Sequence, residues 1–261
     1  MNRLLKITTI AILGVGAAAF ALGRSGRKAR RKLVMANYRV NINMTRGGLK
    51  GLPKEQRRAE AKREVKLVLV RGQATRGFAD TEIPDFLGTD DAVTRFLDIE
   101  PPIAAITPEF QDIVDEIEDT YVVGHFFAAI SSSCVSIERV LNLARIELHQ
   151  YHKKIKQLWN KGPSNAWDEN IDALQAWGYL DATFAKELKA IYVDVRNRYL
   201  HSGPITNMAA DAQRVVKAAY KLLTIFLGFP PDLFRFTSGI ECLNCNDPRF
   251  IAFYKPNIVN D

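Results

Sequence analysis

Cysteine is scarce in this chain of 261 residues, which contains only Cys134, Cys242 and Cys245. Three cysteines are too few and too odd in number for a disulfide framework, so they exclude a small disulfide-stabilised fold and favour a reducing compartment. Neither a GxxxxGK[ST] nor a GxGxxG motif is present, so no sequence signature of a nucleotide-phosphate loop is found. Apolar residues make up 47% and charged residues 25%, which excludes wholesale disorder and a polytopic membrane protein.

Acidic residues are nearly missing from the first third of the chain. Residues 1–78 contain 19 Lys and Arg against 3 Asp and Glu, whereas residues 79–261 contain 17 against 26. The net charge of +7 therefore combines a basic N-terminal third with an acidic remainder. Residues 79–120 are the most acidic part, with 13 Asp and Glu against the single Arg95. This pattern predicts a solvated face, with electrostatic contact to the basic third as the alternative.

Residues 1–23 include a stretch without any charged residue, Thr8 to Gly23. Its 16 residues fall short of the roughly 20 of a spanning helix, but Leu4 and Leu5 extend it if Lys6 snorkels to the interface. Six Lys and Arg follow within residues 24–32, and the positive-inside rule then places the rest of the chain in the cytoplasm. We expect an uncleaved single-pass anchor in the inner or plasma membrane, with the main domain cytoplasmic.

Alternatives for this N-terminal region stay open. Ala19-Phe20-Ala21 is similar to a signal-peptide cleavage site, and an amphipathic or buried segment is a third interpretation. The basic run at 24–32 favours a topology determinant that also contacts anionic lipid, and an RNA-attracting arm is the alternative. No aromatic residue is interleaved in that run, so stacking on bases is not indicated.

The remaining chain divides into four parts. Residues 24–64 form a basic linker with a short charged helix at 54–64, and residues 65–106 form a strand-containing, acidic and irregular segment. The β-prone run Val65–Val70 is the expected strand. Residues 107–230 form an all-α antiparallel bundle, and residues 231–261 form a C-terminal extension. The expected helices are Thr107 through Tyr121, His125 to Trp159, Ser164 to Gly178, Asp181 to Gly203, and Thr206 to Gly228.

Metal-ligand patterns are incomplete, so no metal and no cofactor are predicted. The pair Cys242 and Cys245 has neither a second CxxC nor a neighbouring histidine, although structural zinc needs four ligands. His149 and His152 lack a matched carboxylate. The run Ser131–Cys134 lies within an expected helix without a sharp turn or a nearby base, so we interpret it as small residues that allow close helix packing.

The end of the fourth expected helix carries the most informative cluster: Arg196, Asn197 and His201. Arg196 and His201 are five residues apart, about 140° on an ideal helix, while Asn197 and His201 share a face. A guanidinium matches phosphate oxygens, and imidazole moves protons near neutral pH. The cluster therefore suits a metal-free phosphodiester site. The alternative is a charged last turn that merely complements the helix dipole.

The motif resembles that of the HEPN superfamily, small all-α domains in which an Arg, often followed by a polar residue, precedes a His at the end of a helix. Arg196-Asn197 with His201 fits this pattern, as do the flanking residues 177–181 and 202–204 and the run 137–141. The resemblance covers about 107–230 and implies a homodimer with a composite, metal-independent endoribonuclease site. It implies that His201 transfers the proton, Arg196 stabilises the transition state and Asn197 supports the geometry.

Two functional hypotheses follow, with a third for the exported case. The first is a membrane-tethered HEPN-type ribonuclease that cleaves RNA, with a role in defence or stress suggested by the family and an unidentified regulatory partner. The second is a non-catalytic helical dimerisation or interaction module at the membrane, in which Arg196 and His201 are structural. The third is an envelope-associated protein, which requires the cleaved signal peptide.

Overall fold

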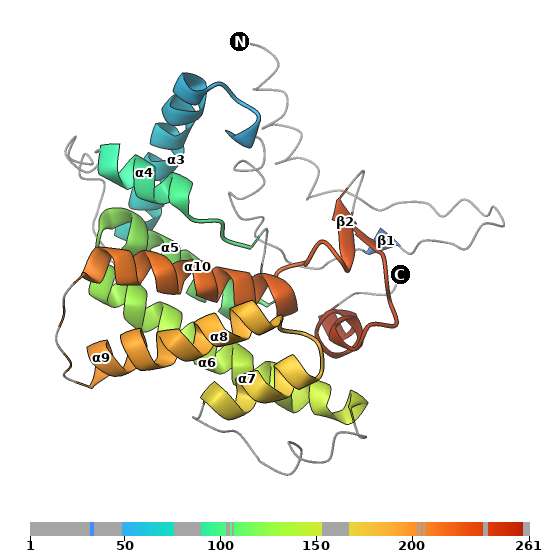
Figure 1. Ribbon diagram of the computed structural model, residues 1–261. Coiled ribbons are helices and arrows are strands. Elements are labelled where there is room, and N and C mark those ends of the chain that lie inside the picture. The colour runs from blue at the N-terminus through green and yellow to red at the C-terminus, as the bar shows by residue number, and fades with distance from the viewer. Residues whose placement is uncertain are drawn as a thin grey trace.

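The computed structural model describes residues 32–33, 49–75, 90–102, 105, 107–152, 167–201, 203, 205, 207–236 and 240–257. The expected membrane anchor at 1–23, most of the basic linker and the end of the second expected helix lie outside these residues. Within the described residues the protein is mostly helical, which confirms the coarse all-α prediction, and a small antiparallel sheet is added near the C-terminus (Figure 1).

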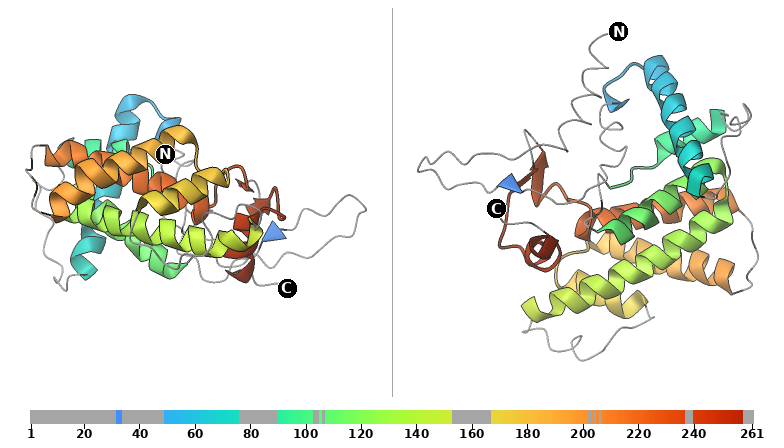
Figure 2. Two further views of the ribbon diagram at one scale, coloured as in Figure 1. Left: turned by 60° about the horizontal axis from the view of Figure 1, so that its bottom comes forward. Right: turned by 180° about the vertical axis from the view of Figure 1, so that it is seen from behind.

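Four helices form the centre of the structure: α5 (Pro108–Val123), α6 (Phe126–Leu148), α8 (Ala182–Ile191) and α10 (Met208–Phe226). The helix α6 packs against α5, α10 and the shorter α7 (Trp167–Ala176). Figure 2 shows α10 and α8 on one side and α5 and α6 on the other. The apolar stripe of α6 explains its central place, because Ile130, Ile137, Leu141 and Leu148 are fully buried.

Local sequence signals set several helix ends, and those at Gly178 and Asp181 were predicted. Gly124 adopts a left-handed conformation at φ 87° and ends α5, so that α6 can return antiparallel to it. Gly178 has φ 84° after α7. The carboxylate of Asp181 caps α8 by accepting the backbone N–H of Phe184 at 2.8 Å. Short connections with these residues are what make neighbouring helices antiparallel.

The helices α5 and α10 differ in how their first turns are capped. Thr107 occupies the N-cap position of α5, but its hydroxyl makes no capping hydrogen bond. The helix α10 is capped by Asn207, whose side-chain oxygen accepts the N–H of Ala210 at 3.3 Å. Thr206, the expected first residue of this helix, lies outside the described residues.

The strand expected at residues 65–70 is wrong, because these residues lie within α3 (Lys54–Thr75). The preceding residues 54–64 are mostly Lys, Glu, Arg, Gln and Ala, all strong helix formers, and a helix that has nucleated extends at low cost. Ala61 and Val65 are buried on one side of α3, which packs against α4 (Asp90–Asp98) and α5. Packing and propagation override the β propensity of the valines.

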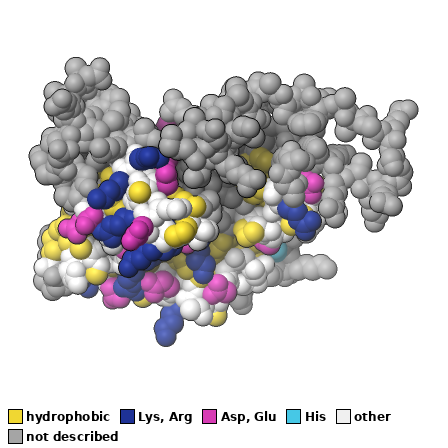
Figure 3. All heavy atoms as spheres, turned by 90° about the horizontal axis from the view of Figure 1, so that it is seen from above, with side chains coloured by type: hydrophobic (Ala, Val, Ile, Leu, Met, Phe, Trp, Pro, Cys, Tyr) yellow, Lys and Arg dark blue, Asp and Glu magenta, His cyan; other side chains and the backbone are white. Residues whose placement is uncertain are grey.

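Charged contacts join α3 to the acidic segment. Arg58 pairs with Asp90 at 2.9 Å and Lys62 pairs with the same carboxylate at 3.5 Å. The hydrogen bond from Arg58 is the main reason that the pKa of Asp90 is lowered. Basic and acidic side chains are interspersed on the face seen from above, rather than separated by sign (Figure 3). The described part of the acidic segment therefore does contact the basic region of the chain.

The C-terminal extension consists of a small sheet and a helical turn. The strands β2 (Phe234–Phe236) and β3 (Ile240–Cys242) form a hairpin, and β1 (Lys32–Leu33) pairs antiparallel with β3 on the other side. The helical turns η5 (Phe250–Tyr254) and η6 (Lys255–Asn257) follow. Arg249 is largely buried, pairs with aspartates of the extension, and lies 5.7 Å from the ring centre of Tyr179. This contact attaches the extension to the bundle.

A helix from Phe126 to Tyr151 is the only one among the described residues that is long and apolar enough to span a membrane. It consists of α6 and the 3-10 turn η2 (His149–Tyr151). Because α6 is packed on three other helices, burial in the bundle core is enough to explain its apolar residues. The predicted anchor at 1–23 stays a prediction.

Candidate functional site

The motif lies on one continuous helix with a wider turn inside it. The helix α8 is followed by the π-helical turn η4 (Tyr192–Arg196) and then by the short α9 (Asn197–Leu200). The N–H of Asn197 donates to the carbonyl of Tyr192, five residues back. Such π turns occur often at functional sites. The helix ends at His201, whose own N–H still donates to the carbonyl of Asn197 at 3.0 Å.

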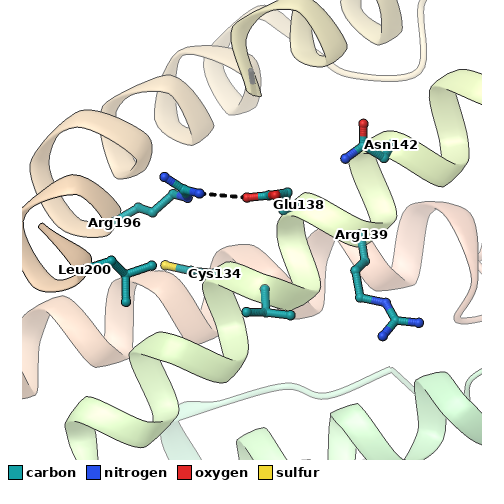
Figure 4. Close-up of a pocket in the computed structure, with 7 residues that line it drawn as sticks. Cys134, Glu138, Arg139, Asn142, Arg196 and Leu200 are labelled. Atoms are coloured by element: carbon teal, nitrogen blue, oxygen red, sulfur yellow. Dashed lines mark hydrogen bonds and ion pairs between the residues drawn. The ribbon is translucent and has the colours of Figure 1, made fainter. Parts of the chain in front are cut away.

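Arg196 points from this turn toward α6 and meets a carboxylate there. Its Nη2 lies 3.0 Å from Oε2 of Glu138, and the two side chains are only 18% and 24% exposed (Figure 4). Its guanidinium carbon also lies 5.2 Å from the centre of the Tyr192 ring. The cation of the motif is therefore held by two groups and is half-buried.

A pocket of about 220 Å³ opens beside this ion pair. Arg196 and Leu200 line it from the motif helix, and the remaining lining residues come from α6: Cys134, Val135, Glu138, Arg139 and Asn142. The rim is accessible, because Val135 is 54% and Leu200 39% exposed. The pocket is thus lined in part by polar side chains, among them Arg196 and Glu138, and it has the exposed apolar side chains of Val135 and Leu200 at its rim.

Cys134 at this pocket is a poor nucleophile. Its side chain is buried, and burial raises the pKa of its thiol to about 12. The thiol therefore stays protonated at neutral pH. The neighbouring Ser133 is also buried, which agrees with the interpretation of residues 131–134 as small residues at a helix contact.

The three predicted site residues lie together in sequence but not in one pocket. Arg196 is the only one of them that lines the pocket. Asn197 is half-buried, and His201 is exposed just past the end of α9. An exposed imidazole is free to meet an approaching ligand. Within the described residues of one chain, the geometry thus presents Arg196 in the pocket and His201 at the adjacent helix end.

Residues on α6 and α7 complete the site and were not predicted to belong to it. Glu138 accepts a second hydrogen bond, from Nε1 of Trp167 at 3.2 Å. Nδ2 of Asn170 donates to Asn142 at 3.0 Å, and Arg145 donates to Asn170. The sequence did carry a signal for this contact, because polar residues at 138, 142 and 145 form one stripe on an apolar helix. Half-buried polar side chains require hydrogen-bonding partners.

The candidate metal ligands have other contacts. His152 stacks on Trp177 at 5.0 Å and forms a hydrogen bond with the Tyr179 hydroxyl at 2.8 Å. Burial lowers the pKa of His152. Burial and the neighbouring Cys245 raise the pKa of Cys242 to about 12. Among the residues that the structure describes, no group of three or more His, Cys, Asp or Glu is placed to hold a metal ion.

Comparisons with protein-family models, with curated proteins and with solved structures found no match to this chain.

Proposed function

We propose that this chain is a metal-independent endoribonuclease of the HEPN type, tethered to a membrane by its N-terminal segment. One observation carries the proposal: Arg196 lines an open pocket, and His201 is exposed at the end of the same helix. A planar, permanent cation and a group that exchanges protons near neutral pH are the two elements that metal-free phosphodiester cleavage requires.

In the proposed reaction the ribose 2′-OH of RNA attacks the adjacent phosphorus. The bond to the 5′-oxygen of the next nucleotide breaks, which leaves a 2′,3′-cyclic phosphate and a free 5′-OH. His201 transfers the proton from the attacking 2′-OH to the leaving 5′-oxygen, Arg196 stabilises the charge that develops on the phosphate oxygens, and Asn197 supports their geometry. The proposal includes a homodimer in which two motif helices face each other. Exposed apolar Val135 and Leu200 beside the pocket suit such a covered face.

Purified protein is expected to cleave single-stranded RNA in the presence of EDTA as fast as in its absence. The same sequence with 2′-deoxyribose at every position should stay intact, because it lacks the attacking hydroxyl. Mass spectrometry of the products should find 2′,3′-cyclic phosphate ends. Cleavage that EDTA abolishes, or cleavage of the deoxy substrate, would contradict the proposed mechanism.

A second function is favoured by the ion pair itself. Because Arg196 is paired with Glu138, it can act as a brace between the motif helix and α6 in a non-catalytic interaction module. This function requires no exposed His201. It is supported if the folded wild-type protein dimerises or binds a partner and cleaves no RNA under any condition, whereas RNA cleavage that depends on His201 contradicts it.

The tether makes a separate prediction. The full chain should stay in the membrane fraction after a wash with high salt, because burial of apolar side chains holds a spanning helix in the bilayer independently of ionic strength. A chain that starts at Arg24 is the matched control and should be released. A reporter fused after Asp261 should behave as cytoplasmic. Release of the full chain by salt contradicts the anchor, and a reporter outside the cytoplasm contradicts the orientation.

A further inference from the structure

Glu138 is the shared acceptor between three parts of the fold. A single oxygen, Oε2, accepts Nη2 of Arg196 at 3.0 Å and Nε1 of Trp167 at 3.2 Å. The carboxylate is on α6, the guanidinium on η4 and the indole at the start of α7. Figure 4 shows the Glu138 and Arg196 side chains extended toward each other across the space between the two helices.

The groups around Glu138 form a closed set of contacts. Trp167 is fully buried, and its ring lies 5.5 Å from that of Tyr192. Tyr192 in turn lies 5.2 Å from the guanidinium carbon of Arg196. Thus Arg196 contacts Glu138 and Tyr192, and both of these contact Trp167. The position of the guanidinium is determined on two sides by groups whose own positions are fixed.

Further hydrogen bonds support this set, because α7 is joined to α6 one turn further along both helices. Asn170 forms hydrogen bonds with both Asn142 and Arg145 of α6. These contacts hold the start of α7, and therefore Trp167, at a constant distance from Glu138. Such a supporting layer is what keeps a functional side chain within a few tenths of an ångström of its working geometry.

A second cationic side chain, that of Arg139, lines the pocket but points away from the ion pair. Arg139 extends away from Glu138 and Arg196 in Figure 4, and its guanidinium carbon lies 5.9 Å from the Phe110 ring centre. Arg196 is therefore the cation that Glu138 orients.

We propose that Glu138 is a positioning residue that orients the guanidinium of Arg196, and that Trp167 fixes Glu138 in turn. The effect on catalysis rests on the proposed ribonuclease function, whereas the effect on the position of the Arg196 guanidinium does not. Without Glu138, Arg196 keeps its charge and still attracts phosphate, but its planar guanidinium is no longer held in one orientation. A misplacement of about 1 Å at a catalytic group can lower the rate about 100-fold.

The kinetic test uses two substitutions of Glu138. Glu138→Ala should lower kcat for RNA cleavage by about 100-fold while KM stays within about threefold, because ground-state attraction to Arg196 persists. Glu138→Gln should recover most of kcat, since its amide oxygen accepts both hydrogen bonds. Glu187→Ala is the matched control, because Glu187 pairs with Arg214 at 2.7 Å away from the pocket. Equal losses of kcat in Glu138→Ala and Glu187→Ala would overturn the proposal.

A spectroscopic test needs no enzymatic activity. The indole N–H signal of Trp167, identified with Trp167→Phe, should shift in Arg196→Ala and in Glu138→Ala, because both change the shared carboxylate. The signal of Trp177 should stay in place in both variants. An unchanged Trp167 signal in Arg196→Ala overturns the proposed coupling even if the protein cleaves RNA. If the wild-type protein cleaves no RNA, the shifted signal still supports the positional link, and only the ribonuclease proposal fails.

Discussion

Replacement of His201 by alanine is expected to lower RNA cleavage by about 10²–10⁴-fold, the usual contribution of a well-placed general acid–base. The imidazole is exposed at the helix end, next to the turn that places Arg196 in the pocket. Because His201 is exposed, its replacement by alanine removes the imidazole without leaving a cavity in the core. Initial rates on a labelled RNA, with the thermal unfolding midpoint as a second measurement, test this expectation.

The matched control is His149→Ala. His149 directly follows the last residue of α6, does not line the pocket, and contacts the carbonyl of Ile146 within its own turn. Its loss should leave the cleavage rate within about twofold. Two results would contradict a catalytic His201: a folded His201→Ala variant that cleaves at the wild-type rate, or a variant that unfolds. In the second case His201 acts as a brace at the helix end.

The helices of the bundle could be predicted from the sequence because the residues that begin and end them act locally. Gly178 and Asp181, where the sequence predicts the end of one helix and the start of the next, act through their own backbone or side-chain geometry. The strand at residues 65–70 failed for the opposite reason. The β propensity of its valines is a weak preference, and burial of Val65 beside α4 and α5 outweighs it.

The site was only partly readable, because half of it depends on tertiary contacts. Arg196 and His201 could be selected by residue type and spacing. On an ideal helix these two residues are about 140° apart. The helix instead contains the π turn η4 before Asn197, and no residue type in the sequence predicts that turn. Glu138 is 58 residues from Arg196, and no spacing rule reaches that far. The contact between Glu138 and Arg196 depends on the packing of α6 beside the motif helix, which residue spacing does not predict.

Replacement of Arg196 should be as damaging as that of His201, and lysine should not restore activity. Arg196→Ala is expected to lower cleavage by about 10²–10³-fold, the cost of removing one group that stabilises the charge of a transition state. It also leaves the half-buried Glu138 with the Trp167 indole but without its cation, so the free energy of unfolding should fall by about 1 kcal/mol. Rates and thermal unfolding of the same preparations test both expectations.

Arg196→Lys separates charge from shape. An ammonium group keeps the positive charge, but it has no planar fork with which to contact the Glu138 carboxylate and a phosphate oxygen at the same time. Most of the activity should therefore remain lost, while much of the stability returns. Arg214→Lys is the matched control, because Arg214 also pairs with carboxylates, Glu187 and Asp194, and none of these three residues lines the pocket. Full activity in Arg196→Lys would show that charge alone suffices, and equal losses in both lysine variants would show that Arg196 contributes only to stability.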